Sequence, residues 1–169
     1  MRPLILVAQR MMVGMDSFPL LAIPLFICTG YLMESTSMAG SLVECVESYV
    51  GKIRGSMGVI TIISCTIFAA LTGSGPATVA AIGAVMLPAL TRTGYPKSTA
   101  AGLVASGGAL GPIVPPSVAM IVYGSTMNLS IPKMFIGSVI PGLFMATVLI
   151  VVNPILVVKY GITRSDTFH

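Results

Sequence analysis

Stretches without charged side chains divide this chain of 169 residues, and their lengths predict how each would sit in a lipid bilayer. Residues 17–33 are 17 uncharged positions, about 25 Å of helix at 1.5 Å per residue. Residues 134–158 are 25 uncharged positions, about 37 Å of helix, which exceeds a hydrocarbon core of about 30 Å. We therefore predict spanning helices over residues 17–36 and 133–158, with two prolines, Pro141 and Pro154, kinking the second or marking its ends.

A longer uncharged stretch, residues 55–91, is interrupted by the sequence TGSGP at residues 72–76. The apolar runs on either side, of 13 and 14 residues, would each form a helix of about 20 Å, too short to cross the core alone. Glycine suits the end of the first helix, and proline suits the first turn of the second. We predict a re-entrant helical hairpin over residues 58–91, with its tip at residues 72–77 inside the membrane.

The uncharged stretch from 98 to 132 is also interrupted, because proline occupies three of the six positions in residues 111–116. Proline removes a backbone donor and clashes with the preceding helical turn. We predict one discontinuous spanning helix over residues 98–128 that is unwound at residues 111–116. Unwound backbone at membrane depth is tolerated only where it is buried in protein or lines a cavity. Both interruptions are therefore candidate functional features.

Residues 39–54 follow a different pattern, with apolar side chains from Leu42 to Ile53 at helical spacing and polar ones such as Glu44 and Lys52 on the other side. This pattern predicts an amphipathic helix along the cytoplasmic membrane interface. The helix is either an arm that connects a fixed scaffold to a moving element or a surface linker, and the pattern leaves both open.

The composition favours a membrane protein, because 55% of the residues are hydrophobic and 8% are charged, against about 25% charged in soluble domains. The predicted fold class is all-α, a single multi-pass transmembrane domain over residues 1–169 in the bacterial inner membrane. The net charge of +4 arises from basic residues between the apolar stretches and not from a basic stripe, so nucleic acid is not a predicted partner.

The same basic residues predict the orientation, because cytoplasmic loops of membrane proteins are enriched in lysine and arginine. If residues 17–33 run from outside to inside, six basic residues fall in the cytoplasm and three outside. The six are Lys52, Arg54, Arg92, Lys97, Lys159 and Arg164, and the three are Arg2, Arg10 and Lys133. The hairpin would then enter and leave the membrane on the cytoplasmic side.

The two interruptions also predict binding chemistry, because helix ends leave backbone groups unpaired. The helices that end there offer carbonyl oxygens, which together with the hydroxyls of Thr72, Ser74 and Ser106 suit a dehydrated Na⁺. The helices that begin there, around Thr78 and Ser117, offer N–H groups and a partial positive charge that suit a carboxylate. Neither interruption contains Asp or Glu, which favours sodium over proton coupling.

Two long motifs resemble the large membrane subunit of TRAP (tripartite ATP-independent periplasmic) transporters. AALTGSGPATVAAIG at residues 69–83 looks like the first hairpin of that subunit. AAGLVASGGALGPIVPPS at residues 100–117, followed by MIVYG at residues 120–124, resembles the same subunit. DSFPLLAIPLF at residues 16–26 is similar to an early spanning helix of the family, so the likeness covers nearly the whole chain.

The resemblance implies a carrier in which a periplasmic solute-binding protein delivers an organic acid, such as a C4-dicarboxylate or sialic acid, to a small and a large membrane subunit. A sodium gradient would drive uptake by an elevator motion. The likeness also implies that Ser74 and the backbone of residues 73–76 form one sodium site with residues 107–112. The chain corresponds to the first of two inverted repeats and lacks the second, so we expect a first-half fragment.

Together, these arguments predict two sets of site residues. The predicted sodium-binding residues are Thr72, Gly73, Ser74, Gly75, Ser106, Gly107, Gly108, Gly111 and Pro112. The predicted substrate-binding residues are Pro76, Ala77, Thr78, Pro116 and Ser117.

Other classes of function fit the residues less well. A channel would need a ring of pore-lining charge, and an intramembrane enzyme would need a nucleophile and base, but the apolar blocks contain no His or Asp. The three cysteines form no CxxC pair, so packed thiols are predicted, with no transition metal and no cofactor beyond Na⁺ as the coupling ion. The alternative that stays open is a membrane assembly scaffold that transports nothing without a second-half polypeptide.

Overall fold

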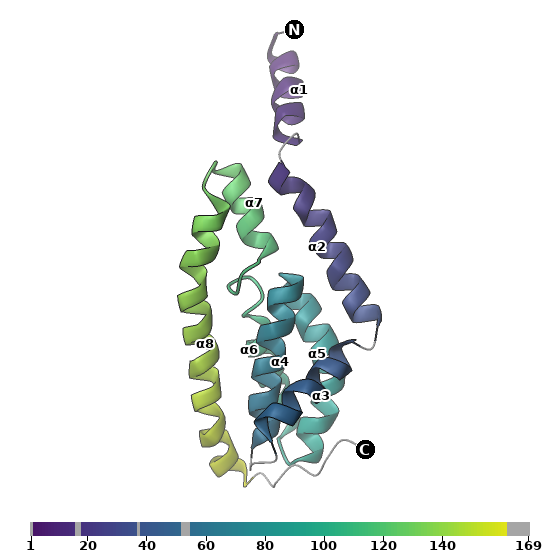
Figure 1. The fold of residues 1–169 in the computed structure, drawn as a ribbon, viewed down its shortest axis with the longest axis vertical. Coiled ribbons are helices and arrows are strands. Elements are labelled where there is room, and N and C mark those ends of the chain that lie inside the picture. The colour runs from purple at the N-terminus through teal and green to yellow at the C-terminus, as the bar shows by residue number, and fades with distance from the viewer. Residues whose placement is uncertain (1, 16–17, 37, 52–54, 162–169) are drawn as a thin grey trace.

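The computed structural model describes residues 2–15, 18–36, 38–51 and 55–161. These residues form α-helices and no strand, which confirms the all-α prediction (Figure 1). The helices are α1 (Arg2–Met15), α2 (Phe18–Ser35), α3 (Met38–Val50), α4 (Ser56–Thr72), α5 (Gly75–Arg92), α6 (Lys97–Gly108), α7 (Val118–Thr126) and α8 (Ile131–Tyr160).

Helices α4 and α5 pack side by side as a hairpin, and α6 lies along both of them. Helix α3 crosses the hairpin, while α2 and α8 flank it on opposite sides (Figure 1). Helix α7 continues beyond the unwound segment after α6 and contacts both α2 and α8. Helix α1, for which the sequence predicts no element, extends away from the other helices (Figure 1).

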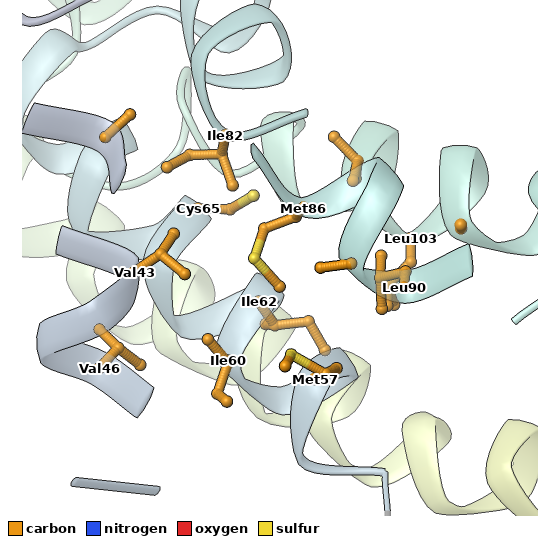
Figure 2. Packing of buried hydrophobic residues seen from close by; sticks show 14 of the residues in the cluster. Val43, Val46, Met57, Ile60, Ile62, Cys65, Ile82, Met86, Leu90 and Leu103 are labelled. Atoms are coloured by element: carbon orange, nitrogen blue, oxygen red, sulfur yellow. The ribbon is translucent and has the colours of Figure 1, made fainter. Parts of the chain in front are cut away.

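Buried apolar side chains hold α3, α4, α5 and α6 together (Figure 2). Ile60 and Ile62 of α4 and Ile82 and Met86 of α5 are fully buried in this core. Side chains of α3, including Val43, also belong to this core. The protein thus covers Val43 and Val46 on the apolar side of the predicted amphipathic helix, whereas Tyr49 on that side is 87% exposed. The helix ends at Val50 because Gly51 takes a left-handed conformation, with φ of 74°. The last predicted positions, 52–54, lie outside the described residues.

The interruption between α4 and α5 is shorter than the predicted tip at residues 72–77, because only Gly73 and Ser74 are not helical. Helix α5 begins at Gly75, since Pro76 fits the first turn, where no intrahelical N–H bond is required. The second interruption is longer than the predicted residues 111–116, because the backbone leaves the helix at 109 and re-enters it at 118. Pro112 has no N–H to donate to the carbonyl four residues earlier, that of Gly108, and its ring clashes with that carbonyl, so α6 ends there.

Helix α8 is longer than the predicted span, with 30 residues or about 45 Å. Pro141 and Pro154 lie inside it and do not mark its ends. Among the described residues, α8 is the one helix that is long and apolar enough to cross a membrane, judged by length and composition. Shorter apolar helices cover Ala22–Met33 and Ser56–Thr72.

Candidate functional site

The tip of the hairpin is a two-residue turn made possible by glycine. Gly73 ends α4 in a left-handed conformation, with φ of 63°, and its N–H donates to the Ala69 carbonyl at 2.8 Å. A residue with a side chain adopts this conformation only at a cost, whereas glycine does so freely. Ser74 follows in an extended conformation, and its carbonyl accepts the amide of Thr78 at 3.2 Å in the first turn of α5. The chain thus reverses between two helix ends.

The two interruptions, far apart in the sequence, contact each other backbone to backbone. The amide of Val118, at the start of α7, donates to the Gly73 carbonyl at 3.4 Å. A Cβ atom on Gly111 would lie 2.6 Å from the Gly75 nitrogen, and one on Gly75 would lie 2.8 Å from the Gly108 carbonyl oxygen. Such distances leave no room for a side chain, so these glycines permit the hairpin tip to lie directly on the unwound segment.

Two threonine hydroxyls maintain the shape of the tip. Thr72 donates to the Phe68 carbonyl at 3.0 Å, and Thr78 donates to the Ser74 carbonyl at 2.8 Å. The two hydroxyls lie 3.5 Å apart, and both side chains are buried. The hydroxyl of Ser74 differs, because this half-buried residue precedes α5 without making a side-chain capping hydrogen bond. Ser74 is therefore the tip hydroxyl that is available to a ligand.

Ser117, at the start of α7, carries a second hydroxyl that the fold leaves unpaired. Its side chain has no exposed surface, and its oxygen has no hydrogen-bond partner. It also makes no capping bond to α7. A buried hydroxyl without a hydrogen-bond partner destabilises the fold by about 1–3 kcal/mol. A polar ligand that paired with this hydroxyl would remove that loss of stability.

A cleft of ≈ 460 Å³ opens beside the tip. One wall is the hairpin tip from Thr72 to Ala77, joined by Pro112 and Val118 of the second interruption. The opposite wall comes from α2 and consists of Phe26, Ile27, Gly30 and Tyr31. These α2 residues are not among the site residues predicted from the sequence. Their spacings of three and four residues do show that they share a helix face, but they do not show what that face contacts.

Four of the nine predicted sodium-binding residues do not line this cleft, namely Ser106, Gly107, Gly108 and Gly111, and the first two also lie away from the hairpin tip. Ser106 is exposed, and its hydroxyl donates to the Gly102 carbonyl of its own helix at 2.7 Å. Gly107 faces α4, where a Cβ atom would lie 2.7 Å from the Cys65 sulfur. Successive residues of a helix point about 100° apart, so Gly108 faces the tip while the two preceding residues face elsewhere. The remaining predicted residues lie at the tip or along the unwound segment.

The cleft combines helix ends of both polarities without a charged side chain in its lining. Helices α5 and α7 begin at the interruptions, where their first amides carry partial positive charge, and α4 and α6 end there with partial negative charge on their carbonyls. The described residues contain no group of three or more His, Cys, Asp or Glu side chains that could hold a metal ion. The polar groups on offer are therefore neutral hydroxyls and backbone.

The family model for the tripartite ATP-independent periplasmic transporter, DctM component, matches residues 1–168. The chain belongs to the DctM family. This family assignment confirms the resemblance found in the two long motifs and places the chain among membrane permeases of transporters, not among enzymes.

Curated relatives support the assignment. The chain is 41% identical over 137 residues to a C4-dicarboxylate TRAP transporter large permease protein of Pseudomonas aeruginosa, covering 81% of this chain and 32% of the relative. It is 43% identical over 141 residues to an isethionate TRAP transporter permease protein of Oleidesulfovibrio alaskensis, covering 83% and 22%. It is 36% identical over 154 residues to a sialic acid TRAP transporter large permease protein of Vibrio cholerae, covering 91% and 36%. The chain thus spans about a third or less of the length of these relatives.

Proposed function

We propose that these residues form part of a sodium-coupled permease that imports an organic acid across the bacterial inner membrane. The observation that carries the proposal is that two interrupted helices meet at one cleft, where the Ser74 hydroxyl makes no capping bond. The Ser117 hydroxyl, buried next to the cleft residue Val118, is also left unpaired by the fold. Interrupted helices that meet within a membrane protein are a recurrent binding device of secondary transporters. The names of the relatives add that related permeases act on C4-dicarboxylates, isethionate and sialic acid.

Sodium would bind as a co-substrate between the tip and the unwound segment. Its ligands would be the Ser74 hydroxyl and backbone carbonyls of residues 72–75, with residues 108–112 opposite. The close contact of Gly75 with Gly108 and Gly111 supports this arrangement, because it brings carbonyl-bearing backbone from both interruptions together. The cleft lining holds no carboxylate that could relay protons, which favours sodium as the coupling ion.

A carboxylate of the organic acid would bind at the beginnings of α5 and α7. Residues 76–78 and 116–117 would supply the partial positive charge of two helix N-termini, and the Ser117 hydroxyl would donate to the anion. The cleft lining contains no basic side chain to bind the carboxylate, and the two helix N-termini would take that role. Each N-terminus favours a nearby negative charge by about 0.3–1 kcal/mol at an exposed site and by more when partly buried.

We also place the hairpin in the membrane as a re-entrant element. Helices α4 and α5 have 17 and 18 residues, about 25 and 27 Å, so length alone does not decide between a re-entrant and a spanning path. The tip, however, lies against the segment between α6 and α7. If α6 and α7 together form one span, their unwound centre lies near mid-depth, and the hairpin tip lies there with it.

The complete carrier would contain further partners and would move as an elevator. We expect a small membrane subunit and a periplasmic solute-binding protein, as the family description implies three components. The amphipathic helix α3 would act as the arm that connects the moving hairpin to a fixed scaffold, since it contacts both α4 and α5.

Transport in a reconstituted system tests this proposal. The full-length permease that contains these residues would be placed in liposomes with its small subunit, and the binding protein would be added outside with a radiolabelled C4-dicarboxylate or sialic acid. We expect uptake of at least one of these acids under an inward sodium gradient. We also expect that a sodium ionophore abolishes uptake.

Two control gradients make the test decisive. An inward choline gradient of equal size and an inward proton gradient without sodium should each give background uptake. Equal uptake with choline, or uptake driven by protons alone, would overturn sodium coupling. Uptake by a permease reconstituted without its hairpin residues would overturn the assignment of the site.

A further inference from the structure

A buried polar cluster lies at the opposite end of the hairpin from the tip. Asn153 of α8 donates from its side-chain nitrogen to the Gly55 carbonyl at 2.9 Å, just before α4 begins. The Tyr95 hydroxyl, in the turn between α5 and α6, donates to the Asn153 side-chain oxygen at 2.8 Å. Asn153 is 1% exposed and Tyr95 is 2% exposed. We call these two residues, with Gly55 and Gly58, the base clamp.

The backbone of α4 is shaped to admit the base clamp. A Cβ atom on Gly58 would overlap the side-chain oxygen of Asn153 and would lie 2.7 Å from the Tyr95 hydroxyl. Gly55 has a left-handed φ of 79°, and a Cβ atom there would overlap a methyl group of Val157 on α8. Glycine is therefore required at both positions, and the close fit leaves one arrangement in which the amide and phenol are both paired.

The base clamp joins both arms of the hairpin to α8. It reaches α4 through Gly55 and Gly58, and it reaches α5 through Tyr95, whose own amide donates to the Leu90 carbonyl at 3.0 Å. From Gly58 to Gly73 the chain runs 15 residues along α4, about 22 Å. A change at the base clamp would therefore reach the tip only through the rigid helices of the hairpin.

An asparagine in an apolar helix has a specific physical consequence. Apolar side chains alone let two membrane helices slide or rotate with little penalty, because lipid tails are as apolar as leucine. A buried polar group is paired in only one register, as a single buried asparagine shows in coiled coils. Burial raises the pKa of the Tyr95 phenol, and the hydrogen bond that the phenol donates to Asn153 also favours its neutral form. The phenol thus remains a neutral donor over the physiological range.

We infer that Asn153 and Tyr95 are positioning residues that fix the register of the hairpin against α8 and thereby set the geometry of the tip. The two arms and α8 then move as one body while the tip binds and releases its ligands. The link to ligand binding rests on the proposed function, whereas the link between clamp and tip geometry does not.

Three variants of the full-length permease test the inference. Asn153→Leu keeps the size of the side chain and removes both hydrogen bonds, and Tyr95→Phe removes one hydroxyl. Ser138→Ala is the matched control, because Ser138 is also a buried polar residue of α8, but its hydroxyl donates to Phe135 of its own helix at 2.9 Å. The double variant, Asn153→Leu with Tyr95→Phe, tests whether the effects of the two substitutions depend on each other.

Hydrogen exchange in lipid nanodiscs gives the readout that does not depend on transport. We expect Asn153→Leu to speed amide exchange at least threefold both at the base, residues 55–60, and at the tip, residues 72–78. Tyr95→Phe should speed exchange at the same two places by a smaller factor. In the double variant, exchange should be no faster than in Asn153→Leu alone. The half-saturating sodium concentration for uptake should rise at least threefold in Asn153→Leu and stay unchanged in Ser138→Ala.

Each outcome has a defined meaning. Faster exchange at the base alone, with an unchanged tip, would mean that the cluster is merely structural and would overturn the inference. If the increases in exchange rate from the two single variants add in the double variant, the two residues act independently, and the proposal that they form one clamp is overturned. If the tip loosens but no sodium-dependent uptake exists even in the unmutated permease, the inference stands and the proposed function fails. Should Asn153→Leu not assemble, the milder Tyr95→Phe decides the question by the same exchange pattern.

Discussion

Replacing Ser74 by alanine is the sharpest perturbation of the proposed sodium site, because it separates ligand binding from folding. Ser74 is half-buried at the start of α5 and makes no side-chain capping bond. A capping serine typically contributes about 0.5–2 kcal/mol to stability, but only through the hydrogen bond that is absent here. We therefore expect Ser74→Ala to leave the expression and subunit assembly of the permease intact.

The expected effect on sodium binding is large by comparison. A sodium ion between the tip and the unwound segment gives up most of its water and depends on each remaining oxygen. Loss of one hydroxyl ligand should cost about 1–3 kcal/mol, the range for a buried polar partner left unmatched. Because about 1.4 kcal/mol corresponds to a tenfold change in an equilibrium constant, sodium affinity should fall roughly 5- to 150-fold.

The assay is the initial rate of organic-acid uptake as a function of sodium concentration, in liposomes that contain the complete carrier. Ser64→Ala is the matched control, because its hydroxyl is buried in α4 without a partner and lies about 12 Å along the helix from Thr72. The control should give the wild-type curve. A Ser74→Ala curve that also superimposes on the wild type would refute the assignment of Ser74 to the sodium site.

Three further predictions follow from single observations. Gly111→Ala should destabilise the permease by about 1–3 kcal/mol in thermal unfolding, because its Cβ would lie 2.6 Å from a backbone nitrogen of the tip. Gly102→Ala is the control and should leave the stability unchanged, because a Cβ atom there would have nothing within 4 Å. Cysteines placed beside Lys97 and Lys133 should label from opposite membrane faces, cytoplasmic and external respectively; labelling from one face would contradict the proposed topology. Thr78→Val should lower the thermal stability by about 1 kcal/mol, because it removes the 2.8 Å bond to the tip carbonyl; an unchanged melting temperature would show that this bond is dispensable.

The broad arrangement of the helices could be predicted because charge, proline and glycine are local signals. The TGSGP motif and the three prolines after Gly111 fix where helices end, whatever surrounds them. The limits of each break were less predictable. Pro76 is equally acceptable in a turn or in a first helical turn, and the structure uses it in the helix.

Features that depend on how helices rotate against one another were not accessible from the sequence. Ser106 looked equivalent to Ser74 as a hydroxyl near a break, yet its helix turns it away from the cleft. Gly30 of α2 lies against Thr72, where a Cβ atom would be 3.5 Å from the Thr72 Cβ, and nothing in the uncharged run around Gly30 indicates that neighbour. Asn153 appeared as one polar residue in an apolar helix, and its partners are 58 and 98 positions away.

The contact between Cys65 and Gly107 supplies the chain with an internal chemical reporter. Cys65 has no exposed surface and its sulfur lies against the glycine of α6, whereas Cys28 and Cys45 are exposed. With those two and every cysteine elsewhere in the complete carrier exchanged for serine, a maleimide should alkylate Cys65 only when the hairpin separates from α6. Labelling kinetics would then time that separation in a working transporter without any foreign probe.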